Sequence, residues 1–113
     1  MWNLNEWNIS FLPAAKRDLV RLSNNEKALV LKAITKVRQN PLPSNEGGYG
    51  KPLGNKNGKN LAGLYKIKLR SSGIRIVYQL IRSETEMRIV VIGVRSDDEV
   101  YDEAARRKKK YNN

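Results

Sequence analysis

Two runs of β-branched and aromatic residues, 64–69 and 74–81, constrain the fold of this chain more than any other feature. Apolar and charged side chains alternate along most of the first run. Ser72-Gly73 separates the two runs, which is typical of a β-hairpin. A two-residue turn at this point places Leu69 opposite Ile76 and gathers apolar side chains on one face. A shift by one residue would mix apolar and charged side chains, so the alternation favours this register.

The sequence on either side of this hairpin predicts three helices and two further strands. Capping boxes at Ser23 and Ser96 each begin a helix. The helix that begins at Ser23 ends before Pro41, because a residue ahead of proline avoids helical angles. The expected strands are 7–11 and 87–94, and the expected helices are 12–22, 23–39 and 96–110. The predicted fold class is α+β: a helical hairpin packs on a small, mainly antiparallel twisted sheet of about four strands, and a C-terminal helix follows.

The length of 113 residues suits a single domain, residues 1–113, without internal repeats. Residues 40–60 hold five Gly and three Pro and lack periodicity, so we expect a long flexible loop. Gly58-Lys59 does not complete a phosphate-binding loop, because that motif requires Gly at the position of Leu53 and Ser or Thr at that of Asn60. Residues 106–113 are expected to form a basic C-terminal tail.

The composition narrows the possible functions. Lys and Arg total 22 and Asp and Glu total 11, and the resulting charge of +11 favours a polyanionic ligand, with nucleic acid first. The lack of Cys and His excludes disulfides, thiolate catalysis and His acid–base chemistry. We interpret the acids of 97–103 as favourable helix N-terminal residues rather than a metal site, and we expect no cofactor. No secretory signal or membrane span is visible, so we expect a cytoplasmic protein without membrane contact.

The predicted hairpin gathers cations on one face. Lys66, Lys68 and Arg70 alternate with apolar residues, and Arg75 lies on the same face of the second strand. Same-face neighbours lie about 7 Å apart, close to the spacing of successive phosphates in a nucleic acid strand. Residues 51–83 contain no acid, so like charges accumulate without compensation, which costs stability unless a ligand supplies negative charge. The alternative interpretation is the solvated face of a half-exposed sheet.

Two segments resemble the RelE family of toxins from bacterial toxin–antitoxin systems. They are Leu61–Leu80, which reads LAGLYKIKLRSSGIRIVYQL, and the ending Gly93-Val94-Arg95 followed by Glu99-Val100-Tyr101. The resemblance spans about residues 7–107 and implies the RelE-like microbial ribonuclease architecture. It also implies a small endoribonuclease that enters the A site of the 70S ribosome, among ribosomal RNA, and cuts mRNA without a metal. A cognate antitoxin protein would neutralise it.

The resemblance further implies roles for five residues. Lys68 is the candidate general base, with Lys66 beside it, and crowding by neighbouring cations is expected to lower the pKa of Lys68. Arg75 would hold the scissile phosphate, Arg95 would act on the leaving-group side, and Tyr101 would orient the attacking sugar or stack on a base. Further RNA contacts are expected from basic residues around this face and in the tail: Lys51, Lys59, Arg70, Arg106 and Arg107.

Two other functions remain open. A ParE-like protein with the same fold would inhibit DNA gyrase by binding it, although such a protein has no need of the cations at 66, 68, 75 and 95. A non-enzymatic RNA- or ribosome-binding module would use the basic face for affinity alone. Val94 stands where family members often have Lys, so the site has fewer cations near Arg95 than the family pattern.

Overall fold

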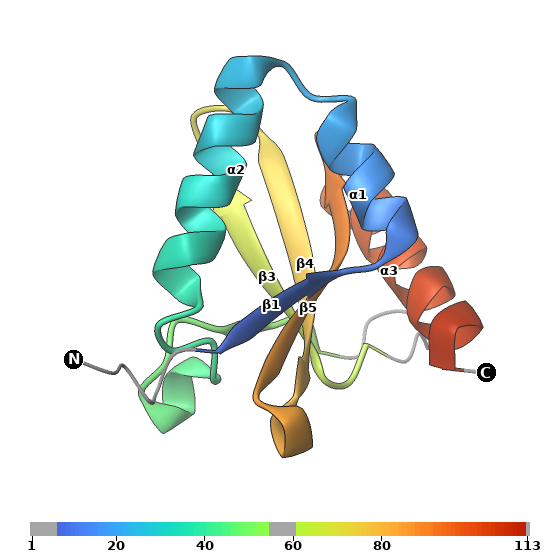
Figure 1. Ribbon diagram of the computed structural model, residues 1–113. Coiled ribbons are helices and arrows are strands. Elements are labelled where there is room, and N and C mark those ends of the chain that lie inside the picture. The colour runs from blue at the N-terminus through green and yellow to red at the C-terminus, as the bar shows by residue number, and fades with distance from the viewer. Residues whose placement is uncertain (1–6, 55–60, 113) are drawn as a thin grey trace.

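The computed structural model describes residues 7–54 and 61–112 and contains one five-stranded sheet with helices packed against it (Figure 1). The strands are β1 (Asn8–Phe11), β2 (Lys51–Pro52), β3 (Leu64–Leu69), β4 (Ile74–Ile81) and β5 (Glu86–Gly93). The α-helices are α1 (Pro13–Val20), α2 (Asn24–Val37) and α3 (Asp97–Asn112), and two short 3-10 helices are η1 (Ser44–Glu46) and η2 (Arg82–Glu84). The strand order is β1-β5-β4-β3-β2, and only the β1–β5 pair is parallel. None of the helices in the described ranges is long and apolar enough to cross a membrane.

The α+β class and the mainly antiparallel sheet are as predicted, but two details differ. The sheet has a fifth strand, because β2 lies in the segment 40–60 that was expected to be a loop and pairs with β3. In place of a compact helical hairpin, α1 and α2 diverge from their connecting turn (Figure 1). Each helix buries its apolar side chains against the sheet, with α1 on β5 and α2 on β3. The apolar surface of each helix is therefore covered by the sheet rather than by the other helix.

The β3–β4 hairpin has the predicted faces but a different register. Leu69 pairs with Ile74, and a four-residue loop replaces the expected two-residue turn. The carbonyl oxygen of Leu69 accepts hydrogen bonds from the backbone of Ser72 at 3.2 Å and of Gly73 at 2.9 Å, and Gly73 has a φ of 73°. A positive φ favours glycine, and here it lets the four-residue loop return the chain to β4. The predicted register is displaced by two residues, and a displacement of two leaves every side chain on its predicted face.

The two faces of the hairpin meet different elements. Cross-strand pairing places Tyr65 beside Tyr78 on one face, where their rings stack with centroids 5.5 Å apart. The buried Tyr78 hydroxyl donates to the carbonyl oxygen of Pro41, just beyond α2, at 2.8 Å. The opposite face carries Lys66, which lies near Tyr101 of α3. The terminal helix therefore covers part of the basic face and leaves the apolar face to the elements before β3.

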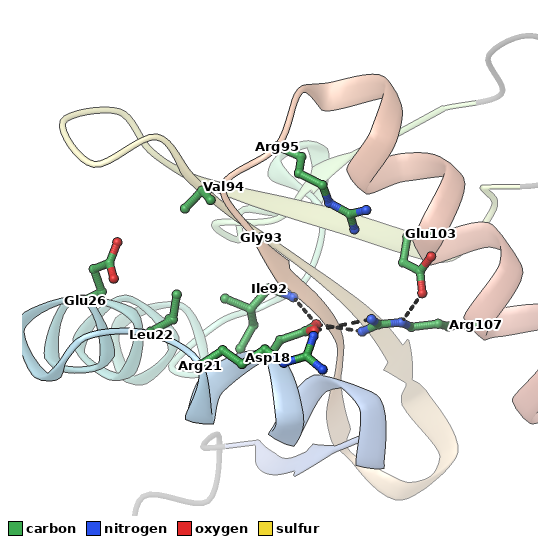
Figure 2. A pocket seen from close by; sticks show the side chains of 10 residues that line it. All are labelled: Asp18, Arg21, Leu22, Glu26, Ile92, Gly93, Val94, Arg95, Glu103 and Arg107. Atoms are coloured by element: carbon green, nitrogen blue, oxygen red, sulfur yellow. Dashed lines mark hydrogen bonds and ion pairs between the residues drawn. The ribbon is translucent and has the colours of Figure 1, made fainter.

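An ion pair forms hydrogen bonds with backbone groups of β5 beyond the point where its pairing with β1 ends. The β4–β5 pairing skips Val90, and its carbonyl oxygen accepts a hydrogen bond from Arg107 of α3 at 2.9 Å. Two residues on, the backbone N–H of Ile92 donates to Asp18 of α1 at 3.0 Å. Arg107 and Asp18 also bond to one another at 2.7 Å, as Figure 2 shows. This charged pair thus supplies hydrogen-bond partners to two backbone groups of β5 and joins α1 to α3.

Arg107→Ala is expected to lower the free energy of unfolding by about 2–4 kcal/mol, because it leaves a mostly buried carboxylate and a strand carbonyl without their donor. The matched control is Arg106→Ala, since the Arg106 side chain is 71% exposed and pairs with Glu103 at the surface. We expect that control to change stability by less than about 0.5 kcal/mol. Urea denaturation of both variants measures the difference, and equal losses would contradict the role given to Arg107.

Candidate active site

A row of cations crosses three neighbouring strands on the face next to α3. Lys66 pairs with Lys51 of β2 on one side, and Lys68 lies directly opposite Arg75 of β4 on the other. Directly paired residues in adjacent strands project from the same side of the sheet, so these side chains share a face. The placement of cations on one face of the hairpin is as the alternation predicted.

A carboxylate joins two of these cations. Asp97 is the first residue of α3, and its Oδ2 atom lies 2.7 Å from Lys68 Nζ while Oδ1 accepts a hydrogen bond from Arg75 Nε. The hydrogen bond from Lys68 is the main cause that lowers the pKa of Asp97 below its ordinary value. Burial opposes this effect, and the hydrogen bond from Arg75 adds to it. The expectation that the cations accumulate without compensation is therefore wrong, because this chain supplies the anion itself.

Sequence reasoning missed Asp97 as a site residue, although a signal was present. Residues 97–103 were interpreted as acids that favour a helix N-terminus, and Asp97 does occupy that position. Antiparallel pairing places Gly93, the last residue of β5, opposite Arg75, so the start of the next helix returns to Arg75. Two of the other acids have different partners: Glu99 bonds to Ser96, and Glu103 to Arg107.

Arg75 is fixed in place by backbone oxygens as well as by Asp97. Its Nη1 atom donates to the carbonyl oxygen of Gly73 at 3.0 Å and to that of Arg95 at 2.6 Å. These contacts tie the guanidinium to the hairpin loop and to the segment before α3. A guanidinium held in this way is preorganised to meet an anion, because little side-chain freedom remains to be lost on binding.

Tyr101 lies beneath the basic row, on the first turns of α3. Its side chain is only 3% exposed, and Lys66 Nζ is 5.9 Å from the ring centroid. Burial raises the pKa of Tyr101, and the negative charge of Asp97 adds to this effect. Among the described residues, none forms a hydrogen bond with its buried hydroxyl. A buried hydroxyl without a partner is unusual in a folded protein.

Arg95 is the predicted catalytic residue that lies apart from the others. Its backbone carbonyl supports Arg75, while its side chain lines a cleft of about 530 Å³ between α1 and α3. Figure 2 shows the Arg95 guanidinium pointing into this cleft, toward Arg107 and Glu103. The structure therefore brings Lys66, Lys68, Arg75 and Tyr101 to one face and places the charge of Arg95 in the adjoining cleft.

The residues expected to contact RNA have varied environments. Lys51 extends the basic row, and Arg70 is exposed in the hairpin loop. Arg106 is exposed on α3, and this helix continues to Asn112 through the basic C-terminal residues. Arg107 is 16% exposed, and its contacts give it a structural role. Lys59 lies outside the described residues.

The comparisons with known proteins agree with this geometry. No protein-family model matches the chain. A segment of 43 residues is 51% identical to the mRNA interferase toxin RelE of Escherichia coli strain K12 and covers 38% of this chain and 45% of that relative. The match thus spans about half the length of the curated relative.

Solved structures extend the likeness to the whole fold. The isolated RelE toxin of E. coli superposes with a TM-score of 0.65 and 28% sequence identity over 90% of this chain and 98% of the toxin. The chain is thus similar to RelE toxins in one 43-residue segment and in its fold. An E. coli RelE variant in complex with a peptide of the antitoxin RelB matches with a TM-score of 0.64 and 28% identity over 88% of this chain and 94% of the variant. These likenesses show that the chain has the same overall fold as these RelE proteins.

Tyr101→Phe is expected to leave the free energy of unfolding within about 0.5 kcal/mol of the parent, because the hydroxyl that it removes makes no hydrogen bond to the described residues. The matched control is Tyr78→Phe, another buried tyrosine, which should lose about 1–2 kcal/mol because the Pro41 oxygen loses its donor. Equilibrium denaturation compares the two variants. Equal losses would show that the Tyr101 hydroxyl has a structural partner.

Proposed function

We propose that this chain is a ribosome-dependent mRNA endoribonuclease, which cuts mRNA in the ribosomal A site and is neutralised by a cognate antitoxin. The observation that carries the proposal is the cluster of Lys66, Lys68, Arg75 and Tyr101 on one face of a RelE-family fold. The name of the E. coli relative, an mRNA interferase toxin, supports RNA as the substrate. The cations suit a reaction whose substrate and transition state are both anionic.

The chemistry follows from the residue types available. The 2′-oxygen loses its proton and attacks the adjacent phosphorus, and the bond to the 5′-oxygen breaks. The 5′-oxygen takes up a proton from water, so a cyclic phosphate and a 5′-hydroxyl result. A lysine of the pair Lys66 and Lys68 accepts the 2′ proton in its neutral form, and Arg75 stabilises the charge that gathers on the phosphate oxygens. Tyr101 orients the attacking sugar, and Arg95 acts from the adjoining cleft on the leaving oxygen. Positioning by the ribosome supplies much of the rate, because such a site has no strong acid–base pair.

The antitoxin is proposed to bind with an acidic or amphipathic segment. The complex of an E. coli RelE variant with a RelB peptide supports a protein partner of this kind. A segment of this chemistry would either cover the basic row or displace α3, which carries Tyr101 and Asp97. In both cases the cations lose access to RNA.

The double variant Lys66→Ala/Arg75→Ala is expected to lower cleavage at least about 100-fold, because it removes charge stabilisation at the phosphate and one candidate base. Cell-free translation of a defined mRNA, with cuts mapped by primer extension, measures this. Free mRNA without ribosomes tests the ribosome requirement. Lys32→Ala on the exposed side of α2 serves as a control for the loss of one positive charge.

Two outcomes of this assay would contradict the nuclease proposal. An absence of cuts in every lane, with ribosome binding and translation intact, would favour the gyrase-binding relative. A gradual loss of RNA affinity with each cation removed, without any cleavage by the parent protein, would indicate a binding module.

Tyr101→Phe should reduce the cleavage rate about 10-fold or more while the fold stays intact, because the hydroxyl is proposed to contact the substrate rather than the protein. Single-turnover cleavage on programmed ribosomes measures the rate separately from binding. An unchanged rate would remove the hydroxyl from the mechanism.

A further inference from the structure

We propose that Asp97 is a built-in substitute for a phosphate, and that an RNA phosphodiester must displace its carboxylate from Lys68 and Arg75 in order to bind. This inference rests on the proposed function, since the phosphate in question is that of the RNA to be cut. Because the carboxylate competes with the phosphate, Asp97 weakens the binding of RNA that the ribosome does not hold in position. Asp97 is therefore proposed to determine specificity.

The geometry of the carboxylate resembles that of a bound phosphate. One oxygen of Asp97 lies 2.7 Å from Lys68 Nζ, and the other accepts from Arg75 Nε. A phosphodiester likewise presents two charged oxygens on one atom, and both anions take charge-assisted hydrogen bonds from ammonium and guanidinium groups. The side chains of the two cations are 36% and 26% exposed, so an RNA strand can reach them from solvent.

The electrostatics favour an anion at this position both with and without RNA. Lys68 and Arg75 lie directly opposite one another across β3 and β4, where like charges repel. Asp97 relieves that repulsion in the protein without RNA, and a phosphate would relieve it in the complex. Binding therefore exchanges one anion for another, and the gain in affinity from these two cations is smaller than it would be with an empty site.

The position of Asp97 permits this exchange. It is the first residue of α3, and its side chain is 34% exposed. A rotation of the side chain can carry the carboxylate into solvent without breaking the helix. The fixed contacts of Arg75 with the backbone oxygens of Gly73 and Arg95 remain, so the guanidinium stays in place for the incoming phosphate.

The exchange gives a physical reason for dependence on the ribosome. Free mRNA can displace Asp97 only through the affinity of its phosphates for Lys68 and Arg75. An mRNA held in the A site is presented at a high effective concentration, and that advantage offsets the competition from the carboxylate. Asp97 would thus suppress binding of unpresented RNA more than binding of presented RNA.

The test is direct binding of an RNA that cannot be cut. A 2′-O-methyl oligoribonucleotide is titrated with purified full-length protein at several salt concentrations and without ribosomes. The variant is Asp97→Asn, and the matched control is Asp98→Asn, which makes the same charge change at the exposed neighbouring residue of the same helical turn. Thermal unfolding of both variants confirms that they are folded.

Asp97→Asn should bind this RNA about tenfold more tightly than the parent, whereas Asp98→Asn should change affinity by less than about threefold, because only Asp97 competes for the phosphate position. A role of Asp97 confined to stabilising the fold would leave the RNA affinity of the folded variant unchanged.

Equal affinities for the two variants would overturn the inference. So would a weaker affinity for Asp97→Asn, which would indicate that Asp97 positions Arg75 for RNA rather than competing with it. Neither result depends on cleavage. Conversely, tighter RNA binding by Asp97→Asn supports the inference even if the ribosome assay finds no cuts by the parent, an outcome that would contradict the nuclease proposal alone.

Discussion

The contact of Asp97 with Lys68 and Arg75 is the interaction on which the site depends. The β3–β4 pairing forces two cations together, and the carboxylate at the start of α3 links both of them to the terminal helix. The same helix carries Tyr101 into place below Lys66. One ion triad therefore links α3 to the sheet and sets the electrostatic state of the basic row.

Local patterns were enough to predict the two strands of the hairpin and their faces. The strands at 64–69 and 74–81 have the predicted bounds, because alternation and β-branching are properties of neighbouring residues. The register was wrong by two residues, since alternation cannot distinguish registers that differ by an even number. Gly73 adopts a positive φ at the end of the four-residue loop that joins the strands in the observed register.

The missed parts depend on contacts between distant segments. Strand β2 has only two residues and no pattern of its own, and it forms because the edge of β3 offers unpaired backbone groups. Asp97 was classified correctly as an acid at a helix N-terminus, but its partners lie 22 and 29 positions away in the sequence. The positions of the cations could be predicted from the alternation along a strand. The position of the anion between them could be predicted only from the path that the chain takes after β5.

The net charge of +11 is therefore a poor measure of what an RNA strand meets. Arg107 is mostly buried and serves to hold α1, α3 and the edge of β5 together through Asp18, and Lys68 and Arg75 share one carboxylate. The cations with the most suitable geometry are thus the ones already engaged within the protein. Affinity for RNA then depends on which internal ion pairs a phosphate can replace, and a partly exposed pair at a helix end is far easier to exchange than one enclosed beside Asp18.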